Sequence, residues 1–322
     1  LVRHAEELKT AMDKTVILLC QMKDIRNSFR RCAAGEIPDH VELFEMKGFL
    51  RRLEGILPLF EEMNEKVAFR GLSFHAPKEA LAVLDPDGTG SRGFYIPDSA
   101  TPKLREIRAA KKKVEEKLFH AATDAEKDEL RIERTRICAE EDSEETKVRA
   151  MMGAALAPMV EDILADAENV GRLDFMIQKA LFAVRYGGVR PEITDGALEL
   201  VDMVNPEIVD LLTEQRRTFV PVSISLNRGA TVITGANMGG KSGAMKTVAL
   251  NALLFQAGFL VCAREAKMPL FHSVKMLFDD LQSIQSGLSG FGSEIVHFQK
   301  ALDEVEQGYS LFLLDEFARG TN

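Results

Sequence analysis

The sequence has few cysteines and no long apolar run. Its four cysteines are scattered without the spacing of a metal site, so we interpret them as free thiols of a protein in a reducing cytosol. No apolar run approaches the roughly 20 residues of a membrane-spanning helix, which predicts a cytoplasmic protein without membrane contact. The six histidines show neither metal-ligand nor catalytic-triad spacing. We therefore interpret His272 and His297 as surface or core residues and not as catalytic ones.

Positive charge is also in short supply. Lysines and arginines total 41 against 50 aspartates and glutamates, which gives a net charge of −9 and a pI of about 5.4. A dedicated nucleic-acid-binding protein is more often basic, at least on one face. Basic residues do gather between 103 and 117, where they alternate with glutamates at helical spacing. We expect a solvated helix with i,i+4 ion pairs there, and a DNA-binding stripe is the alternative. The basic residues are Lys103, Arg105, Arg108, Lys111, Lys112, Lys113 and Lys117.

The length of 322 residues fits one or two domains, and 46% hydrophobic residues suffice for a core in each. Apolar periodicity predicts amphipathic helices over 1–33 and 39–66, the second kinked at Pro58. Residues 84–102 are rich in turn formers, with a candidate short strand at 93–96. The charged stretch 103–150 predicts a helical hairpin, and 152–186 a helix pair interrupted near Asn169. We therefore expect an all-α domain over 1–200 and a second domain over 201–322.

The second domain contains a phosphate-binding motif with the pattern G-x-x-x-x-G-K-S, the P-loop. The apolar, β-branched segment 230–234 before it predicts a buried strand, and the apolar spacing after it predicts a helix beginning near Lys241. Glycines let successive N–H groups point at phosphates, and the helix N-terminus adds partial positive charge. Lys241 would reach the β- and γ-phosphates, and the Ser242 hydroxyl would bind Mg²⁺. The predicted ATP-binding residues are Gly235, Ala236, Asn237, Met238, Gly239, Gly240, Lys241 and Ser242.

A second motif agrees with the first. The apolar run 310–314 predicts a buried strand that ends in two carboxylates, which resembles the Walker B pattern. Asp315 would hold the metal, directly or through water, and Glu316 would orient the water at the γ-phosphate. Glu316 and Lys241 are therefore the candidate catalytic residues of a Mg²⁺-dependent ATPase, and Ser242 and Asp315 are the candidate metal ligands. An ordinary strand end is the alternative for the two carboxylates.

Three segments together resemble the MutS family of DNA mismatch-repair ATPases. They are residues 234–242, the stretch 289–294 with the pattern S-x-F-x-x-E, and residues 314–321. The similarity is strong from about residue 219 onward and weak before it, where 43–47 and 173–183 look like pieces of the family's helical core and lever region. It implies an α/β P-loop NTPase domain of the ABC type, C-terminally incomplete in this chain, preceded by an all-α core/lever domain.

The resemblance also implies a homodimer. In this family two ATPase domains face each other, and the signature serine of one subunit contacts ATP held by the other. Ser289 matches that serine. Phe219 matches an aromatic residue that lies against adenine, and an ordinary core phenylalanine is the alternative. Gln282 is a weaker candidate for the segment that couples ATP to the rest of the protein. The implied cofactors are ATP and Mg²⁺.

The sequence departs from the family pattern at several points. Ala236 stands where proline is usual, and Gly243 and Gly290 stand where threonine is usual. The stretch 103–150 is short for a DNA clamp, and no mismatch-reading domain is visible. These departures point to a divergent MutS-like branch. Because an ABC-type fold needs further strands after Asn322, we expect the chain to be a fragment whose hydrolysis is incomplete on its own.

Two functions stay open on this sequence. In the first, a dimeric MutS-like ATPase couples ATP binding and hydrolysis to its grip on double-stranded DNA, as in mismatch repair. In the second, a MutS-related ATPase remodels or reactivates a partner enzyme, such as a lysine aminomutase, without mismatch recognition. The P-loop and the Walker B pattern are common to both, whereas the acidic composition, the short clamp region and the Gly-Ala-Asn loop at 235–237 favour the second.

Overall fold

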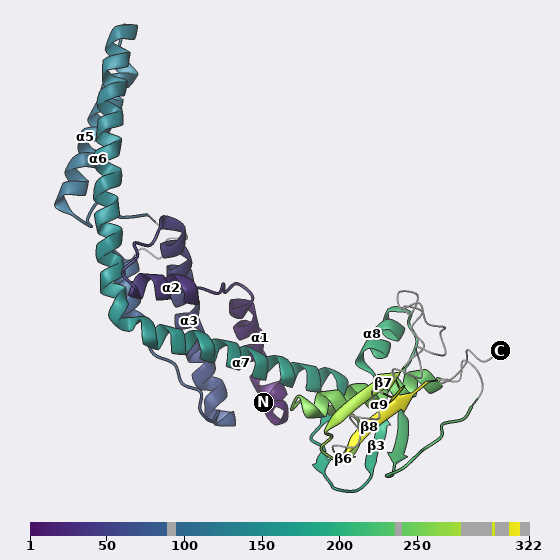
Figure 1. Ribbon diagram of the computed structural model, residues 1–322. Helices are drawn as coiled ribbons and strands as arrows, with labels where there is room; N and C mark the ends of the chain where they lie inside the picture. Colours follow the sequence, from purple (N-terminus) through teal and green to yellow (C-terminus); the bar gives the residue numbers. More distant parts are fainter. Residues whose placement is uncertain (89–94, 236–239, 278–297, 300–308, 316–322) are drawn as a thin grey trace. The chain divides into compact units, whose positions relative to one another are not determined.

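The computed structural model describes residues 1–88, 95–235, 240–277, 298–299 and 309–315. The chain divides into two compact units, shown in Figure 1. The first consists of Leu1 and residues 6–177, and the second of residues 2–5 and 178–322. The division falls inside α7 (Val160–Tyr186), whereas the boundary expected from the sequence, at 200, lies inside β3 (Leu198–Met203).

The first unit is built entirely from helices in its described part. Its helices are α1 (Ala5–Leu19), α2 (Arg26–Ala33), α3 (His40–Val67), α4 (Lys78–Leu84), α5 (Pro102–His120), α6 (Asp124–Leu156) and the first part of α7. The caps are visible in the sequence. Asp39 and Glu42 form a capping box that starts α3, and the hydroxyls of Thr101 and Thr123 cap α5 and α6.

Two of the helices predicted for this unit have other bounds. The single helix expected over 1–33 is divided into α1 and α2, because the Asp24 side chain accepts the backbone N–H of Arg26 and favours a turn there. The interruption expected near Asn169 is absent, and α7 runs through it. A polar residue at this point of the helix has a structural role, because Asn169 Nδ2 donates a 2.8 Å hydrogen bond to the carbonyl oxygen of Ser73.

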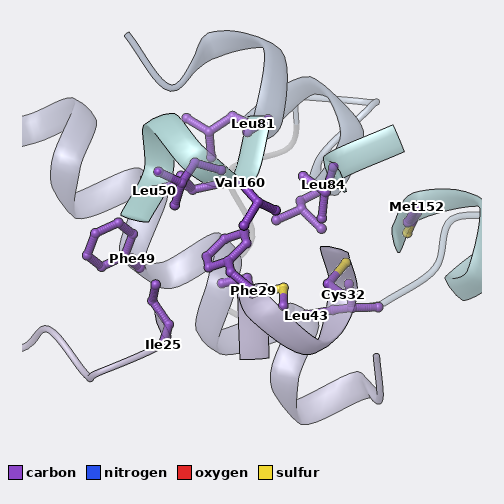
Figure 2. Close-up of a cluster of buried hydrophobic side chains, with 14 of the residues drawn as sticks. Ile25, Phe29, Cys32, Leu43, Phe49, Leu50, Leu81, Leu84, Met152 and Val160 are labelled. Atoms are coloured by element: carbon purple, nitrogen blue, oxygen red, sulfur yellow. The ribbon is translucent and has the colours of Figure 1, made fainter. Parts of the chain in front are cut away.

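One hydrophobic core joins α2, α3, α4, α6 and α7 of the first unit. Figure 2 shows Phe29 and Leu43 among the side chains of this cluster, and both are fully buried. On α3 the buried residues recur every three or four positions, which places one helix face against the other helices. Buried residues of this core include Ile25, Phe29, Cys32, Leu43, Phe49, Leu50, Leu81, Leu84, Met152 and Val160.

The hairpin of α5 and α6 is held by a short apolar seam and by ion pairs. Ile107 and Val114 of α5 pack with Ile137 of α6. The prediction of i,i+4 ion pairs within α5 is wrong. The partly buried arginine and lysine of α5 form their ion pairs with glutamates of α6 instead. Arg108 bonds Glu141 at 3.0 Å and Glu145 at 2.8 Å, and Lys111 bonds Glu141 at 2.6 Å; further members of the basic cluster, Arg105, Lys112, Lys113 and Lys117, are exposed.

In its described part the second unit contains the strands, the end of α7, and the helices α8 (Pro206–Glu214) and α9 (Lys241–Gln256). A four-stranded sheet has the order β2-β6-β3-β4, while β7 and β8 pair in parallel and β1 pairs with β5. Side chains of α9, including Val248, Ala249 and Ala252, share one core with β3, β6 and β8. The strands other than β3 are β1 (Gly188–Val189), β2 (Glu192–Ile193), β4 (Val222–Leu226), β5 (Val261–Cys262), β6 (Glu265–Met268), β7 (Ser273–Leu277) and β8 (Ser310–Leu314).

The strand expected just before the P-loop is not formed. Residues 230–234 have no regular structure and are exposed, with Val232 82% and Ile233 36% accessible. β-branched residues favour a strand only where a neighbour takes up their backbone hydrogen bonds and a face packs on a core. Among the described strands none pairs with this segment. The apolar run 310–314, in contrast, forms β8 as predicted.

The structure bears on the cysteines and on membrane-spanning helices. All four cysteines are free thiols, as predicted. In the part of the chain that the structure describes, no helix is both long enough and apolar enough to cross a membrane.

Candidate nucleotide-binding site

The N-terminus of α9 presents the residues expected to hold phosphate. Gly240 is the N-cap residue, with φ 81° and ψ 11°, a left-handed conformation that glycine adopts without a steric penalty. Lys241 and Ser242 are the first two residues of the helix, and Ser242 is exposed. The unpaired N–H groups and the helix dipole favour an anion at this point. The helix thus begins at Lys241, as the sequence predicts.

Lys241 brings the two ends of the loop together. Its Nζ donates a 2.8 Å hydrogen bond to the carbonyl oxygen of Gly235. A side chain at Gly235 would contact the Lys241 stem, since an ideal Cβ there lies 3.8 Å from Cγ. The loop residues between them, Ala236, Asn237, Met238 and Gly239, lie outside the described residues.

The predicted metal ligand Asp315 follows the carboxyl end of β8. Its backbone N–H donates a 3.0 Å hydrogen bond to Leu277 O, which extends the parallel pairing of β7 and β8 by one step. At the other end of α9, the Gln256 side chain exchanges two hydrogen bonds with the backbone of Phe271, just before β7. The helix therefore runs antiparallel to β7 and β8, with its first turn toward the strand ends that Asp315 follows (Figure 1). Ligands of open α/β sheets bind at such carboxyl ends.

The donor set fits a hard divalent cation. Ser242 offers a hydroxyl oxygen at the start of α9, and Asp315 offers carboxylate oxygens after β8. Mg²⁺ prefers oxygen ligands, and it is usually held by one or two protein groups together with phosphate oxygens and water. Among the described residues no cluster of three or more His, Cys, Asp or Glu side chains could hold a metal without such help.

The remaining predicted site residues are placed less fully. Phe219 lies between α8 and β4, is half-buried, and has no aromatic partner in the described part of the chain. Ser289, Gln282 and the catalytic candidate Glu316 lie outside the described residues, so their roles stay predictions.

A group of buried polar side chains on α9 and at the N-terminus of α8 was not predicted from the sequence. Asn205, Thr247 and Asn251 are each at most 4% exposed and hydrogen-bond to one another or to nearby backbone. The signal was present in the sequence, because Asn251 interrupts the apolar face of α9 formed by Val248, Ala249 and Ala252.

Comparison with known proteins gives one family model, whose match includes Lys241 and Asp315, and several curated relatives. The model of the family MutS domain V matches residues 231–322. "Endonuclease MutS2" of Clostridium botulinum (strain ATCC 19397 / Type A) is 33% identical over 186 residues, which are 56% of this chain and 23% of the relative. "DNA mismatch repair protein MutS" of Leptospira interrogans serogroup Icterohaemorrhagiae serovar Lai is 32% identical over 198 residues, 59% of this chain and 23% of the relative. The matched part thus spans about a quarter of the length of these curated relatives.

Proposed function

We propose, on the premise that this chain belongs to the MutS family, that it is the ATP-binding and ATP-hydrolysing part of a homodimer that uses ATP to change its grip on DNA. The observation that carries the proposal is the arrangement at the start of α9. Lys241 and Ser242 begin a helix directed toward the strand ends that Asp315 follows. Phosphate, lysine, metal and carboxylate can meet only where such elements converge.

Each residue has a distinct part in the proposed site. The Lys241 ammonium neutralises the β- and γ-phosphates, and Ser242 and Asp315 would hold Mg²⁺, which supplies charge neutralisation at the phosphates when bound. Glu316 orients the attacking water, and Phe219 stacks on adenine. Ser289 contacts the ATP of the partner subunit. Because phosphoryl transfer is mostly positioning and charge neutralisation, these parts suffice for hydrolysis once two ABC-type domains face each other.

DNA is the first candidate for the macromolecule that is handled. The printed names of the relatives refer to DNA mismatch repair and to an endonuclease. On the first unit, Arg105, Lys112, Lys113 and Lys117 of α5 are exposed and make no ion pair within 4 Å among the described residues. Unpaired cations on one helix can exchange counterions for DNA phosphates.

A partner enzyme is the second candidate. The chain carries a net charge of −9, and the two most buried cations of α5, Arg108 and Lys111, are already neutralised by α6. The electrostatic footprint left for DNA is therefore small. The free thiols support a cytoplasmic location for either function.

Fluorescence anisotropy of the full-length protein on matched, mismatched and branched DNA tests the choice. We expect binding that weakens with salt and changes on adding ATP, and loses its ATP response in Lys241→Ala. Replacing Arg105, Lys112, Lys113 and Lys117 by alanine should reduce the salt dependence. Absence of DNA binding even at low salt, in a protein that hydrolyses ATP, would refute the DNA function and favour the remodelling ATPase.

A further inference from the structure

A chain of buried polar groups connects the N-terminus of α8 to the first turn of α9. The Asn205 Oδ1 accepts the backbone N–H of Ile208 at 3.3 Å and so caps α8. Its Nδ2 donates to the Thr247 hydroxyl at 3.4 Å, and that hydroxyl donates to the carbonyl oxygen of Gly243 at 2.7 Å. Asn205 is 4% and Thr247 is 3% exposed. Since water does not replace these bonds readily, each member depends on the next.

Asn251, one turn after Thr247 on the same face of α9, fixes the helix further along its length. This fully buried residue accepts the backbone N–H of Cys262 at 2.7 Å, and its Nδ2 lies 3.4 Å from the carbonyl oxygen of Val204. The backbone N–H of Val204 in turn donates to Cys262 O at 2.7 Å, which closes a ring of three residues. Val204 is thereby held to α9 and β5, which fixes the backbone position of the adjacent Asn205.

The chain ends directly beside the proposed phosphate and metal ligands. Gly243 follows Lys241 and Ser242 in the first turn of α9. Ile208 of α8 packs over that turn, since an ideal Cβ on Gly243 would lie 3.9 Å from Ile208 Cδ1. At its other end, α8 leads through residues 215–218 to Phe219, the proposed adenine contact. The bonds of Asn205 and Thr247 therefore link the helix that precedes the adenine contact to the turn that holds the phosphates.

We propose that Asn205 and Thr247 are positioning residues of the nucleotide site, which set the orientation of the Ser242–Gly243 turn for Mg²⁺-ATP through the Thr247 hydroxyl. A threonine hydroxyl bonded to the carbonyl four residues earlier tilts that carbonyl and bends the helix locally. The second bond, from Asn205, fixes the direction in which the hydroxyl points. The inference rests on the proposed ATPase function and adds residues that contact neither nucleotide nor metal. Small displacements of a binding turn carry large rate effects.

Steady-state ATPase assays of the full-length protein at varied Mg²⁺ test the proposal. Thr247→Val keeps the side-chain shape but removes the hydroxyl. We expect it to lower kcat/KM for ATP about tenfold and to raise the Mg²⁺ concentration for half-maximal rate. Thr247→Ser should restore both values. Asn205→Asp keeps the acceptor that caps α8 but removes the donor to Thr247, so it should shift both values in the same direction as Thr247→Val.

A matched control separates positioning from folding. Thr15 of α1, in the first unit, is also fully buried and makes the same kind of bond, 2.7 Å to Ala11 O. Thr15→Val should lower the melting temperature without changing kcat/KM or the Mg²⁺ midpoint. The proposal is overturned if Thr247→Val and Asn205→Asp behave like this control, or if Thr247→Ser is as impaired as Thr247→Val. If Thr247→Val does not fold, Asn205→Asp decides alone. A wild-type protein without ATP turnover would instead refute the proposed function itself.

Discussion

The ammonium nitrogen of Lys241 lies 2.8 Å from the carbonyl oxygen of Gly235 and donates a hydrogen bond to it. The lysine that is expected to bind phosphate thus donates to the first residue of its own motif. A phosphate oxygen, being charged, is a stronger hydrogen-bond acceptor than a carbonyl oxygen, so it can accept the hydrogen bond that Lys241 donates to Gly235. ATP binding at the proposed site would therefore exchange the bond of Lys241 to Gly235 for a bond to phosphate.

Glu316→Ala should separate ATP binding from ATP hydrolysis. The carboxylate is proposed to orient water and not to hold the nucleotide, so ATP affinity stays near that of the wild type. The hydrolysis rate should fall by roughly 10²-fold or more, as expected when a group of this kind is lost. Single-turnover hydrolysis with the full-length protein measures the rate directly. An unchanged turnover would remove Glu316 from the mechanism.

Arg108→Ala should destabilise the α5–α6 hairpin. The Arg108 side chain is 10% exposed and bonds Glu141, Glu145 and the carbonyl oxygen of Ile96. Its removal leaves two largely buried carboxylates with fewer partners, which we expect to cost about 2–3 kcal/mol of unfolding free energy. Urea unfolding followed by circular dichroism measures the loss. Lys112→Ala, on the exposed face of the same helix, is the matched control and should leave the unfolding curve unchanged.

The hairpin should also lose stability in acid. Burial acts to raise the pKa of Glu141, but hydrogen bonds from Lys111 and Arg108 outweigh it and hold that pKa below its ordinary value. The Arg108 hydrogen bond likewise lowers the pKa of Asp98. Groups with a depressed folded-state pKa contribute stability above their unfolded pKa, and this contribution disappears as the pH falls through the folded pKa. Urea midpoints should therefore fall below about pH 4.5. Arg108→Ala should flatten this dependence, and an equally steep one would contradict the assignment.

Gly243→Ala should stabilise the second unit. Glycine inside a helix is less favourable than alanine by roughly 0.5–1 kcal/mol. The new Cβ would meet Ile208 Cδ1 at 3.9 Å, an ordinary van der Waals distance, so no clash offsets the gain. Thermal unfolding should show a higher midpoint. A lower midpoint would mean that the glycine is required for close packing of α8 on α9.

Most of the helical part of the fold can be predicted from the sequence, because the spacing of its apolar residues matches the buried face of each helix. On α3 the spacing predicts Leu50, Leu53 and Phe60 as core residues, and all three are buried. Phe44 also fits an apolar face but is 43% exposed, because Leu43 and Met46 continue the three- and four-residue spacing instead. Periodicity finds the helix reliably, whereas the exact face depends on which neighbours pack against it.

The α/β part is harder to predict, because sheet formation depends on partners distant in the sequence. The segment 230–234 is richer in β-branched residues than 310–314, yet only the second is a strand, since β7 pairs with it and it shares a core with α9. The P-loop helix itself was predictable from Gly240 and Lys241. The polar contacts of Asn205 and Thr247 were not, because they join residues 42 positions apart.

Equilibrium ATP binding by the full-length protein, with wild type and Lys241→Ala compared, tests the central claim most directly. Losing a charge-assisted hydrogen bond should weaken ATP affinity about 10- to 100-fold. Lys246→Ala, an exposed lysine on the same helix, should bind as the wild type does. Equal affinity of wild type and Lys241→Ala would show that the start of α9 is not the phosphate site.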